Sequence, residues 1–390
     1  MHPTSTLVQT AYQKSVELLR RNLTPNGVMA AGVSSLAERR SYTGIFGRDA
    51  SICALGMVHS GDPTLIQGAR DGLLTLANHQ ADNGQIPKFV DPATGDADFW
   101  YVGCIDATLW WLVAVEHLSR YTADPALTSR LRLNIDKALS WLHGQEHPQF
   151  GLLQQNEASD WADIMPRSGF VLYTNALWYR VKTLYGLAHA EPTRLHFNQL
   201  FHPFSGPLPE LKRLRLLTHY PRTRAAQSAL YLSFVNLSRW GDEGDVFGNL
   251  LALLFGLADD AATARVLHAL EQAKIDLPYP VVALLDPIHT QDPLWRGYMS
   301  RHRQNLPHQY HNGGIWPFVG GFWVVVLSMT GERQRAERAL EALAAANRLN
   351  DWQFNEWLHG KTGEPSGMAG QSWNAATYIL AYHALQHGVL

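Results

Sequence analysis

Two stretches of the sequence put carboxyl groups beside tryptophans. The first, NEASDWADIMPRSG, has Asp160 and Asp163 on either side of Trp161, with Arg167 following them. The second, FNEWLHGKTGEPSG, sets Glu356 among aromatic residues and then enters a turn rich in glycine and proline. A single Glu is most often an exposed residue at a helix end, so a chemical role has to be argued from the surrounding residue types.

Acids beside tryptophans are the residue types that a sugar site needs. A pyranose has apolar C–H faces that stack on aromatic rings, and hydroxyls that need polar partners. Hydrolysis of a glycosidic bond needs two carboxyl groups, one protonated to donate to the leaving oxygen and one ionised to activate water or to attack. Aromatic surroundings raise the pKa of a carboxyl group, so the donor is expected beside Trp161. The alternative is that these acids are helix caps or hydrogen-bonded structural residues.

Composition limits the classes of partner. The chain has 390 residues, of which 46% are hydrophobic and 17% charged, so it can bury a large core. A net charge of -2 gives no field that would attract a polyanion, so we expect no nucleic-acid partner. The first residues lack an apolar signal region, and the most apolar later stretch is short and broken by Gly and Pro. We therefore expect a soluble, cytoplasmic protein that does not enter a membrane.

Signatures of cofactors and metals are missing from the sequence. Cys53 and Cys104 are its two cysteines, too few for a disulfide framework or a cysteine-based metal site. We find no H-E-x-x-H spacing and no P-loop, dinucleotide or nucleophile-elbow motif. We expect no cofactor and no metal, with a small carbohydrate as the partner, and the sequence leaves the oligomeric state open.

Helical periodicity predicts about a dozen helices along the whole chain. Apolar residues recur at three- and four-residue spacing in segments such as TLVQTAYQKSVELLRR, LWWLVAVEHLSRY and NAATYILAYHALQHG. Connections alternate between short and long, and the long ones carry the acids and tryptophans. This rhythm predicts helix pairs closing into a ring, as one domain over residues 1–390. Residues 203–243 interrupt it with basic residues and a β-prone run, so we expect a lid-like insertion with a short hairpin there.

Six stretches occur in the same order as corresponding stretches of a known family. They are YTGIFGRDASICALGM, IDATLWWLVAV, SDWADIMPRSGFVLYTNALWY, FGNLLALLFGLAD, YHNGGIWPFVGGFWV and NEWLHGKTGEPSGMAGQSWNAATYILAYHAL. Through them the chain resembles the neutral/alkaline invertase family over nearly all its length except about residues 190–240, and more distantly the trehalases and processing α-glucosidases. The resemblance implies an all-α fold, an (α/α)6 barrel of six helical hairpins, with inverting acid/base chemistry.

The resemblance assigns the two chemical roles. It makes Asp163 the counterpart of the general acid and Glu356 the counterpart of the general base. Asp160 is the alternative acid, but the trehalase-type motif has its acid after the tryptophan and an Arg four residues later, as Arg167 follows Asp163. Asp160 would then be a capping or substrate-side residue. Asn175 matches an amide position near the sugar, or else it bonds within a helix pair.

The resemblance also implies which residues hold the sugar. It assigns Arg48, Asp49 and Asp106 to the pocket that grips the non-reducing sugar, although an Asp at a helix start can equally be a cap. The other expected contacts are the loop residues His311, Asn312 and Trp316 and the aromatic residues Tyr42, Phe46, Trp100, Tyr101, Trp110, Trp161 and Trp357.

The sequence leaves the substrate open among small α-glucosides. Invertases carry a DRRMGIHGHP-like stretch after the acid, whereas this chain has DIMPRSGFVLY, without the basic pair or the histidines. Sucrose, trehalose, a glucosylated solute and an α-1,6-glucosyl stub therefore remain candidates. Two other classes fit a ring of helix pairs, namely a sugar epimerase or isomerase and a non-catalytic sugar-binding protein. Epimerases transfer protons through histidines, and the acid-bearing loop NEASDWADIMPRSG contains none, which favours the hydrolase.

Overall fold

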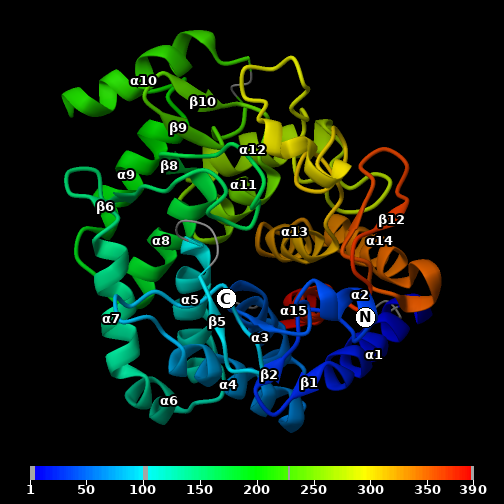
Figure 1. Cartoon of the computed structure of the whole chain (residues 1–390). Coiled ribbons are helices and arrows are strands. Elements are labelled where there is room, and N and C mark those ends of the chain that lie inside the picture. The colour runs from blue at the N-terminus through cyan, green and yellow to red at the C-terminus, as the bar shows by residue number, and fades with distance from the viewer. Residues whose placement is uncertain (1–4, 100–103, 227–228, 388–390) are drawn as a thin grey trace.

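The computed structural model describes residues 5–99, 104–226 and 229–387 (Figure 1). Within these ranges six helices form an inner ring, in which each helix packs against the next and the last returns to the first. They are α3 (Gly47–His59), α5 (Ile105–Tyr121), α8 (Leu172–Leu184), α11 (Val246–Leu254), α13 (Pro317–Met329) and α15 (Ser372–His387). Figure 1 shows the closure directly, since the red α15 lies beside the blue α3.

Six further helices of the described ranges form an outer layer around this ring. They are α1 (Thr6–Arg21), α4 (Pro63–Asn78), α7 (Arg132–His143), α9 (Ala190–Phe201), α12 (Asp260–Gln272) and α14 (Arg333–Trp352). Helix α1 packs on α15, α4 on α3, α7 on α5, α9 on α8, α12 on α11 and α14 on α13. Inner and outer helices alternate along the chain, so the fold is an (α/α)6 barrel, as the sequence predicts.

The hydrophobic pattern explains which helices are inner. All nine residues of α11, VFGNLLALL, are buried, and α13 is buried from Pro317 to Leu327. A helix that is apolar all round has to be surrounded by protein. The outer helix α1 instead buries one face, with Val8, Ala11 and Leu18 inside and charged residues outside. Outer helices therefore shield the ring from water with one face each.

Short strands occur in the connections between helices. The pairs are β1 (Leu23–Thr24) with β2 (Gly27–Val28), β6 (Glu146–His147) with β7 (Leu152–Leu153), and β11 (Trp357–Leu358) with β12 (Pro365–Ser366). Two three-stranded sheets are β3 (Ile45–Phe46), β4 (Phe89–Val90) and β5 (Ala97–Asp98), and β8 (Phe170–Val171), β9 (Phe234–Asn236) and β10 (Arg239–Gly241). All are antiparallel, and they brace the loops that carry the predicted functional residues.

The predicted insertion contains the predicted hairpin. Helix α10 (Lys212–Arg224) lies at the outer edge of the molecule in Figure 1, and β9 and β10 follow it as a hairpin that extends from β8. The lid position is not seen, because none of the described residues of 203–243 lines the cavity that contains Asp163 and Glu356. The β8–β9 pairing draws this hairpin toward α8 instead.

Three short helical segments complete the described chain, α2 (Ser35–Arg39), α6 (Pro125–Arg130) and a 3-10 segment at Gly297–Arg303. None of the helices in the described ranges is long and apolar enough to cross a membrane.

Candidate active site

A cavity of about 360 Å³ brings Asp163 and Glu356 into one site. Its wall is polar and aromatic at once, and residues from both halves of the chain build it. The lining residues are Arg40, Ser41, Tyr42, Phe46, Arg48, Asp49, Lys88, Phe89, Asp98, Trp161, Asp163, Tyr310, His311, Trp316, Glu356 and Trp373. The cavity therefore combines stacking faces with carboxyl groups and cations, the chemistry expected of a sugar site.

Glu356 is held in place by two hydrogen-bond donors. It directly precedes β11, and its backbone N–H donates to the carbonyl of Met368 at 2.8 Å. The Tyr42 hydroxyl donates to Oε1 at 2.7 Å, and the Met368 N–H donates to Oε2 at 2.9 Å. Burial raises the pKa of Glu356 to about 7, although both donors act in the opposite direction by stabilising the ionised form.

Asp163 is less tightly held and more accessible. Its side chain is 22% exposed and lies in the loop between β7 and β8. The Lys88 Nζ is 3.8 Å from Oδ2, and the His311 Nδ1 is 3.7 Å from Oδ1. Burial raises the pKa of Asp163, and the positive charges of Lys88 and Arg48 oppose that rise. Burial also lowers the pKa of His311 well below its ordinary value, so this imidazole is neutral beside the carboxyl group.

Asp163 also borders a second cavity. This outer cavity, of about 420 Å³, shares Asp163 and Tyr310 with the inner one and is otherwise lined by Ala158, Ile164, Tyr298, Arg301, His302 and Gln304. Glu356 does not line it. The two carboxyl groups therefore differ in position: Asp163 lies at the junction of the cavities, whereas Glu356 lies in the inner one alone.

Arg48 and Asp49 lie in the first turn of α3 and face the inner cavity. Neither caps the helix, because its N-cap residue is Phe46 and no side-chain cap bond is formed there. Nε of Arg48 and Oδ2 of Asp49 are buried, 3.7 Å apart, and have no hydrogen-bond partner among the described residues. Burial raises the pKa of Asp49 to about 6, with the Arg48 charge opposing the rise. Unsatisfied polar atoms in a cavity wall mark a position where a ligand can bind.

Asp106 lies behind this wall. It is buried in α5, where its Oδ2 accepts hydrogen bonds from Nη1 of Arg48 and the hydroxyl of Tyr173, both at 3.0 Å. The Trp110 indole N–H donates to the same Tyr173 hydroxyl at 2.7 Å. Asp106 thus holds Arg48 from the side away from the cavity, and Trp110 bonds to the Tyr173 hydroxyl that also contacts Asp106. Neither Asp106 nor Trp110 lines the cavity, although the sequence predicts both as possible sugar contacts.

Three indole rings contribute to the wall of the inner cavity, those of Trp161, Trp316 and Trp373. Trp161 packs edge-on against Trp316, with ring centres 5.5 Å apart, and Trp373 stacks on Phe318 at 3.9 Å. The buried indole N–H groups of Trp161 and Trp373 have no hydrogen-bond partner among the described residues. Both rings line the cavity, so these unpartnered donors lie in or directly behind its wall.

Several other predicted residues belong to the framework of the protein. Asp160 and Asp245 flank Arg167 in a buried ion triad, with N–O distances of 2.6 and 2.9 Å. Oδ1 of Asp160 also accepts from the N–H of Ala162 within a loop that contains no helix, so Asp160 is not a helix cap. This triad ties the loop that carries Asp163 to the start of α11, and none of its members lines the inner cavity.

Asn175 and Asn312 likewise have structural roles. Asn175 is buried, and its side-chain amide exchanges hydrogen bonds with the backbone of Leu153. Asn312 is bonded in the same way to the backbone of Ile288. Their amides are used within the protein, so they are not free to contact a sugar. Trp357 is buried in β11 and is also absent from the wall, while Trp100 and Tyr101 lie outside the described residues.

Several residues of the wall were not singled out from the sequence. Lys88 and Phe89 enter it because the register of the β3–β4–β5 sheet sets Phe46 opposite Phe89. A two-residue strand leaves almost no pattern in the sequence. Tyr310 and Trp373 lie within the family-like stretches YHNGGIWP and GQSWNAAT, so the resemblance could have revealed them. Arg40 and Ser41, in the loop before Tyr42, complete the set of unpredicted wall residues.

In the part of the chain that the structure describes, no cluster of three or more His, Cys, Asp or Glu side chains is arranged to hold a metal ion.

The helical barrel with carboxyl groups among aromatic rings defines the class of protein: the chain is a glycoside hydrolase. The family model described as alkaline and neutral invertase matches residues 245–388. Probable alkaline/neutral invertase D of Arabidopsis thaliana is 22% identical over 440 residues, covering 95% of this chain and 81% of the relative. Cytosolic invertase 1 of Oryza sativa subsp. japonica is 22% identical over 438 residues, covering 95% and 77%. These matches confirm the resemblance seen in the sequence.

Solved structures share the fold at low sequence identity. The GH63 mannosylglycerate hydrolase from Thermus thermophilus, in complex with Tris and D-glycerate, superposes with a TM-score of 0.67 at 16% identity, covering 95% of this chain and 99% of that one. A bacterial glucoamylase complexed with acarbose gives a TM-score of 0.65 at 16% identity, covering 97% and 56%. Both similarities are to (α/α)6 barrel glycosidases.

Proposed function

We propose that this protein is an inverting glycosidase that cleaves a small α-glucoside, with Asp163 as general acid and Glu356 as general base. The observation that carries the proposal is the position of the two carboxyl groups. Asp163 borders both cavities, and Glu356 borders the inner one alone. An acid that protonates the oxygen between two sugar units has to lie where their subsites meet, whereas a base that activates water has to lie beside the sugar that is attacked.

The surroundings of Asp163 support the acid role. Burial raises its pKa, which keeps a proton on the carboxyl group at higher pH than in water. His311 beside it is neutral and adds no positive charge that would favour loss of that proton. In the proposed step Asp163 donates its proton to the glycosidic oxygen as the bond to the anomeric carbon breaks, and the leaving group departs into the outer cavity.

The surroundings of Glu356 support the base role. Tyr42 and Met368 both donate to its oxygens, so the carboxylate is stabilised once it is ionised. In the proposed step Glu356 takes a proton from a water molecule whose oxygen bonds to the anomeric carbon from the opposite face. Configuration is therefore inverted, and exchange of protons with solvent returns both carboxyl groups to their starting states.

The inner cavity suits one sugar unit. Arg48 and Asp49 supply polar atoms without partners among the described residues, and the indole N–H groups of Trp161 and Trp373 add two more. We assign the non-reducing glucosyl unit to this cavity.

The relatives named invertases make sucrose the first substrate to test, and the cytosolic rice relative supports a cytoplasmic location. In this proposal residues 1–390 form one catalytic domain, which binds a carbohydrate and does not bind nucleic acid.

A second substrate class is favoured by the outer cavity. Arg301 lines it and forms no ion pair with any acidic residue in the described ranges. A guanidinium group facing a leaving-group subsite suits a carboxylate on the leaving group. The structurally similar mannosylglycerate hydrolase was crystallised with D-glycerate, so a glucoside of a small hydroxy acid is the second candidate.

Glucose release and product stereochemistry test the proposal together. The purified protein is incubated with sucrose, trehalose, isomaltose, maltose, glucosylglycerol and glucosylglycerate, and proton NMR follows the anomeric signals. We expect β-glucose to appear first from an α-glucoside, before mutarotation. Asp163→Asn and Glu356→Gln should each lower turnover by at least about a hundredfold while remaining folded.

Three outcomes would contradict the proposal in different ways. Release of α-glucose as the first product, or a glycosyl ester trapped on Glu356, would exclude the inverting mechanism. Near-normal turnover of either variant would exclude that role assignment. Failure to release glucose from any of these substrates would favour the epimerase or sugar-binding alternatives.

A further inference from the structure

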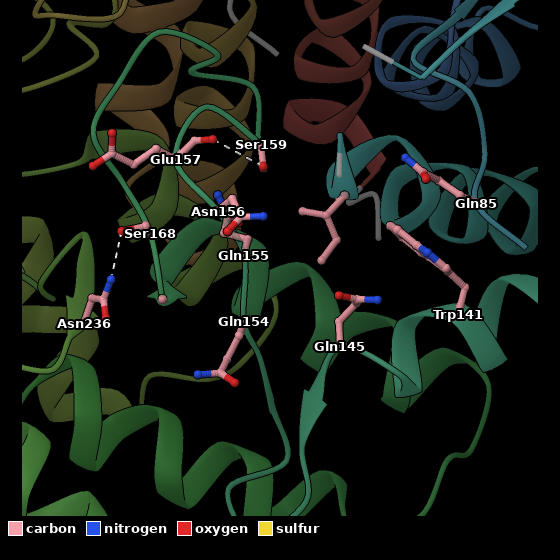
Figure 2. Close-up of a pocket in the computed structure, with 12 residues that line it drawn as sticks. Gln85, Trp141, Gln145, Gln154, Gln155, Asn156, Glu157, Ser159, Ser168 and Asn236 are labelled. Atoms are coloured by element: carbon pink, nitrogen blue, oxygen red, sulfur yellow. Dashed lines mark hydrogen bonds between the residues drawn. The ribbon is translucent and has the colours of Figure 1, made fainter. Parts of the chain in front are cut away.

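The largest of the described cavities lies outside the candidate active site. It measures about 660 Å³ and is formed at the loop that carries Asp163, by residues that do not line the inner cavity. In Figure 2, Trp141, Gln85 and Gln145 lie on one side of this cavity, and Gln155, Asn156 and Ser168 lie on the other. The mechanism proposed above uses none of these side chains.

The wall of this cavity is neutral and rich in amides. Among the described lining residues are four glutamines, two asparagines and two serines, and no Lys, Arg or His. Glu157 is the acidic residue in that set, and its carboxylate is already bonded to the guanidinium of Arg296 and the hydroxyl of Tyr298. Amide groups both donate and accept hydrogen bonds, as sugar hydroxyls do. The wall therefore suits an uncharged ligand with many hydroxyl groups and not an ion.

Three of these side-chain amides are exposed to solvent and have no hydrogen bond within the described part of the protein. The side chains of Gln145, Gln154 and Asn156 make no hydrogen bond with any described residue. Gln155, in contrast, is bonded to Asp160 and Thr174. Gln155 is therefore held by the protein, whereas the other three amides can bond to a ligand.

The backbone that carries Gln145 and Gln154 is held in a defined arrangement. Gln145 and Gln154 flank the β6–β7 hairpin, and the N–H of Gln154 donates to the carbonyl of Gln145 at 3.1 Å. The backbones of Gln155 and Gly169 exchange two hydrogen bonds at 2.9 Å. This isolated bridge fixes the backbone at Gln155, on the other side of the cavity from Trp141. A rigid backbone reduces the entropy that a ligand would have to offset on binding.

Trp141 adds an aromatic surface to this polar wall. It lies near the end of α7, partly buried against the hydrophobic core, and lines the cavity across from Asn156 (Figure 2). A pyranose presents apolar C–H groups to such a ring while its hydroxyls reach the surrounding amides. We infer that this cavity is a second carbohydrate site, which binds a neutral mono- or disaccharide away from the two candidate catalytic carboxyl groups.

The site adjoins the catalytic loop without being part of the proposed chemistry. Nε2 of Gln155 donates to Oδ2 of Asp160 at 2.9 Å, and Asp160 is the partner of Arg167 in the buried triad. A bound sugar would therefore contact a segment that is bonded to the loop carrying Asp163. Binding itself does not depend on hydrolysis, so it is tested apart from the proposed function.

The test uses the Glu356→Gln protein, which should not consume a substrate, with nitrogen-15 label in its tryptophans. The indole N–H signal of Trp141 is assigned by its loss in Trp141→Phe, and glucose, sucrose and trehalose are titrated separately to about 100 mM. We expect at least one of them to shift this signal saturably. The double variant Gln145→Ala/Asn156→Ala should bind that sugar about tenfold more weakly, because two hydrogen bonds are lost.

Gln149→Ala is the matched control. Gln149 is an exposed glutamine of the same hairpin that does not line the cavity, so this variant should bind as the parent does. The inference is overturned if none of the three sugars moves the Trp141 signal, or if the double variant binds as tightly as the control. A moving Trp141 signal in a protein whose wild type releases no glucose would support this site and reject the proposed hydrolase.

Discussion

Glu356 links the geometry of the site to its pH dependence. Burial raises its pKa to about 7, and the hydrogen bonds from Tyr42 and Met368 limit the rise. A general base acts in its ionised form, so the activity contributed by Glu356 should be present above pH 7 and lost as the pH falls through that value. The acidic limb of the kcat/KM profile should therefore have its midpoint near pH 7, and activity should fall again at higher pH as Asp163, the proposed acid, loses its proton.

Tyr42→Phe tests whether the ionisation of Glu356 sets the acidic limb of the pH profile, because it removes a single hydroxyl group. Removing the hydroxyl withdraws a donor that stabilises the ionised carboxylate, so the pKa of Glu356 should rise further. A hydrogen bond to a charged group contributes about 1.5 kcal/mol or more, so the acidic limb of the kcat/KM profile should move upward by about one pH unit. Initial rates measured across the pH range give the midpoint.

Tyr310→Phe controls for the loss of a hydroxyl from the same cavity. Tyr310 lines the wall, but Glu356 takes its phenolic hydrogen bond from Tyr42. In this variant the midpoint of the acidic limb of the kcat/KM profile should be the same as in the wild type, even if KM changes. A midpoint unchanged in Tyr42→Phe as well would show that Glu356 is not the group that titrates.

At the level of single residues, the sequence predicts the two candidate catalytic carboxyl groups better than it predicts the roles of the residues around them. Asp163 and Glu356 were predicted from their aromatic neighbours and from the resemblance, and they do line one cavity. For Asp106 the sequence allowed a sugar contact or a helix cap, and for Asn175 a sugar contact or a bond within a helix pair. In the structure Asp106 bonds to Arg48 from behind the wall and Asn175 bonds to backbone. Residue type shows that a group is polar, but whether it faces a ligand or the framework depends on a side-chain direction that the sequence does not encode locally.

The element that carries Glu356 depends on a glycine. Gly367 follows β12 with a φ of +77°, and a Cβ atom there would lie 2.3 Å from Oε2 of Glu356. The hairpin of β11 and β12 thus lets the chain pass directly beside the carboxylate and present the N–H of Met368 to it. Any side chain at position 367 would displace the candidate base.

Gly367→Ala should therefore lose most of its turnover, by at least about tenfold, as well as some stability. Gly363→Ala, in the turn that joins β11 to β12, is its matched control. Gly363 also has a positive φ, +72°, but its Cβ would approach the Tyr279 ring at 3.0 Å and not Glu356. Positive φ costs a non-glycine residue about 1 kcal/mol or more, so both melting temperatures should fall. Equal turnover in the two variants would contradict the role given to Gly367.

At the level of elements, helices were predicted well and strands poorly. The inner and outer helices follow from apolar periodicity that extends over nine to twenty residues each. The strands outside the β9–β10 hairpin are two residues long, too short to show an alternating pattern, yet one such sheet brings Phe89 and Asp98 to the cavity. The hairpin at residues 234–241 was expected, but its pairing with β8 depends on a partner far away in the sequence.

The whole molecule depends on the closure of the ring between its first and last inner helices. Helices α3 and α15 are separated by almost the whole chain, yet they pack side by side and both contribute to the cavity, through Arg48 and Asp49 on one and Trp373 on the other. Helical periodicity predicts that such helices exist, and the alternation of short and long connections and the resemblance both predict that they close into a ring. The closeness of their approach becomes visible in the structure, where a Cβ atom on Gly56 would lie 1.9 Å from the carbonyl oxygen of Ala376.

Gly56→Ala should thus disturb the closure of the barrel. Alanine favours a helix over glycine by about 0.5–1 kcal/mol, but here its methyl group would meet the backbone of α15, and forced overpacking costs about 1–3 kcal/mol. Gly72→Ala, inside α4, is the control, because its Cβ would meet neighbours only at 3.6 Å or more. Urea unfolding followed by circular dichroism should show Gly56→Ala clearly less stable than wild type and Gly72→Ala equal to it or more stable. If Gly56→Ala gained stability as Gly72→Ala does, α3 and α15 would not pack as closely as this arrangement requires, and the positions of Arg48, Asp49 and Trp373 relative to one another would have to be revised.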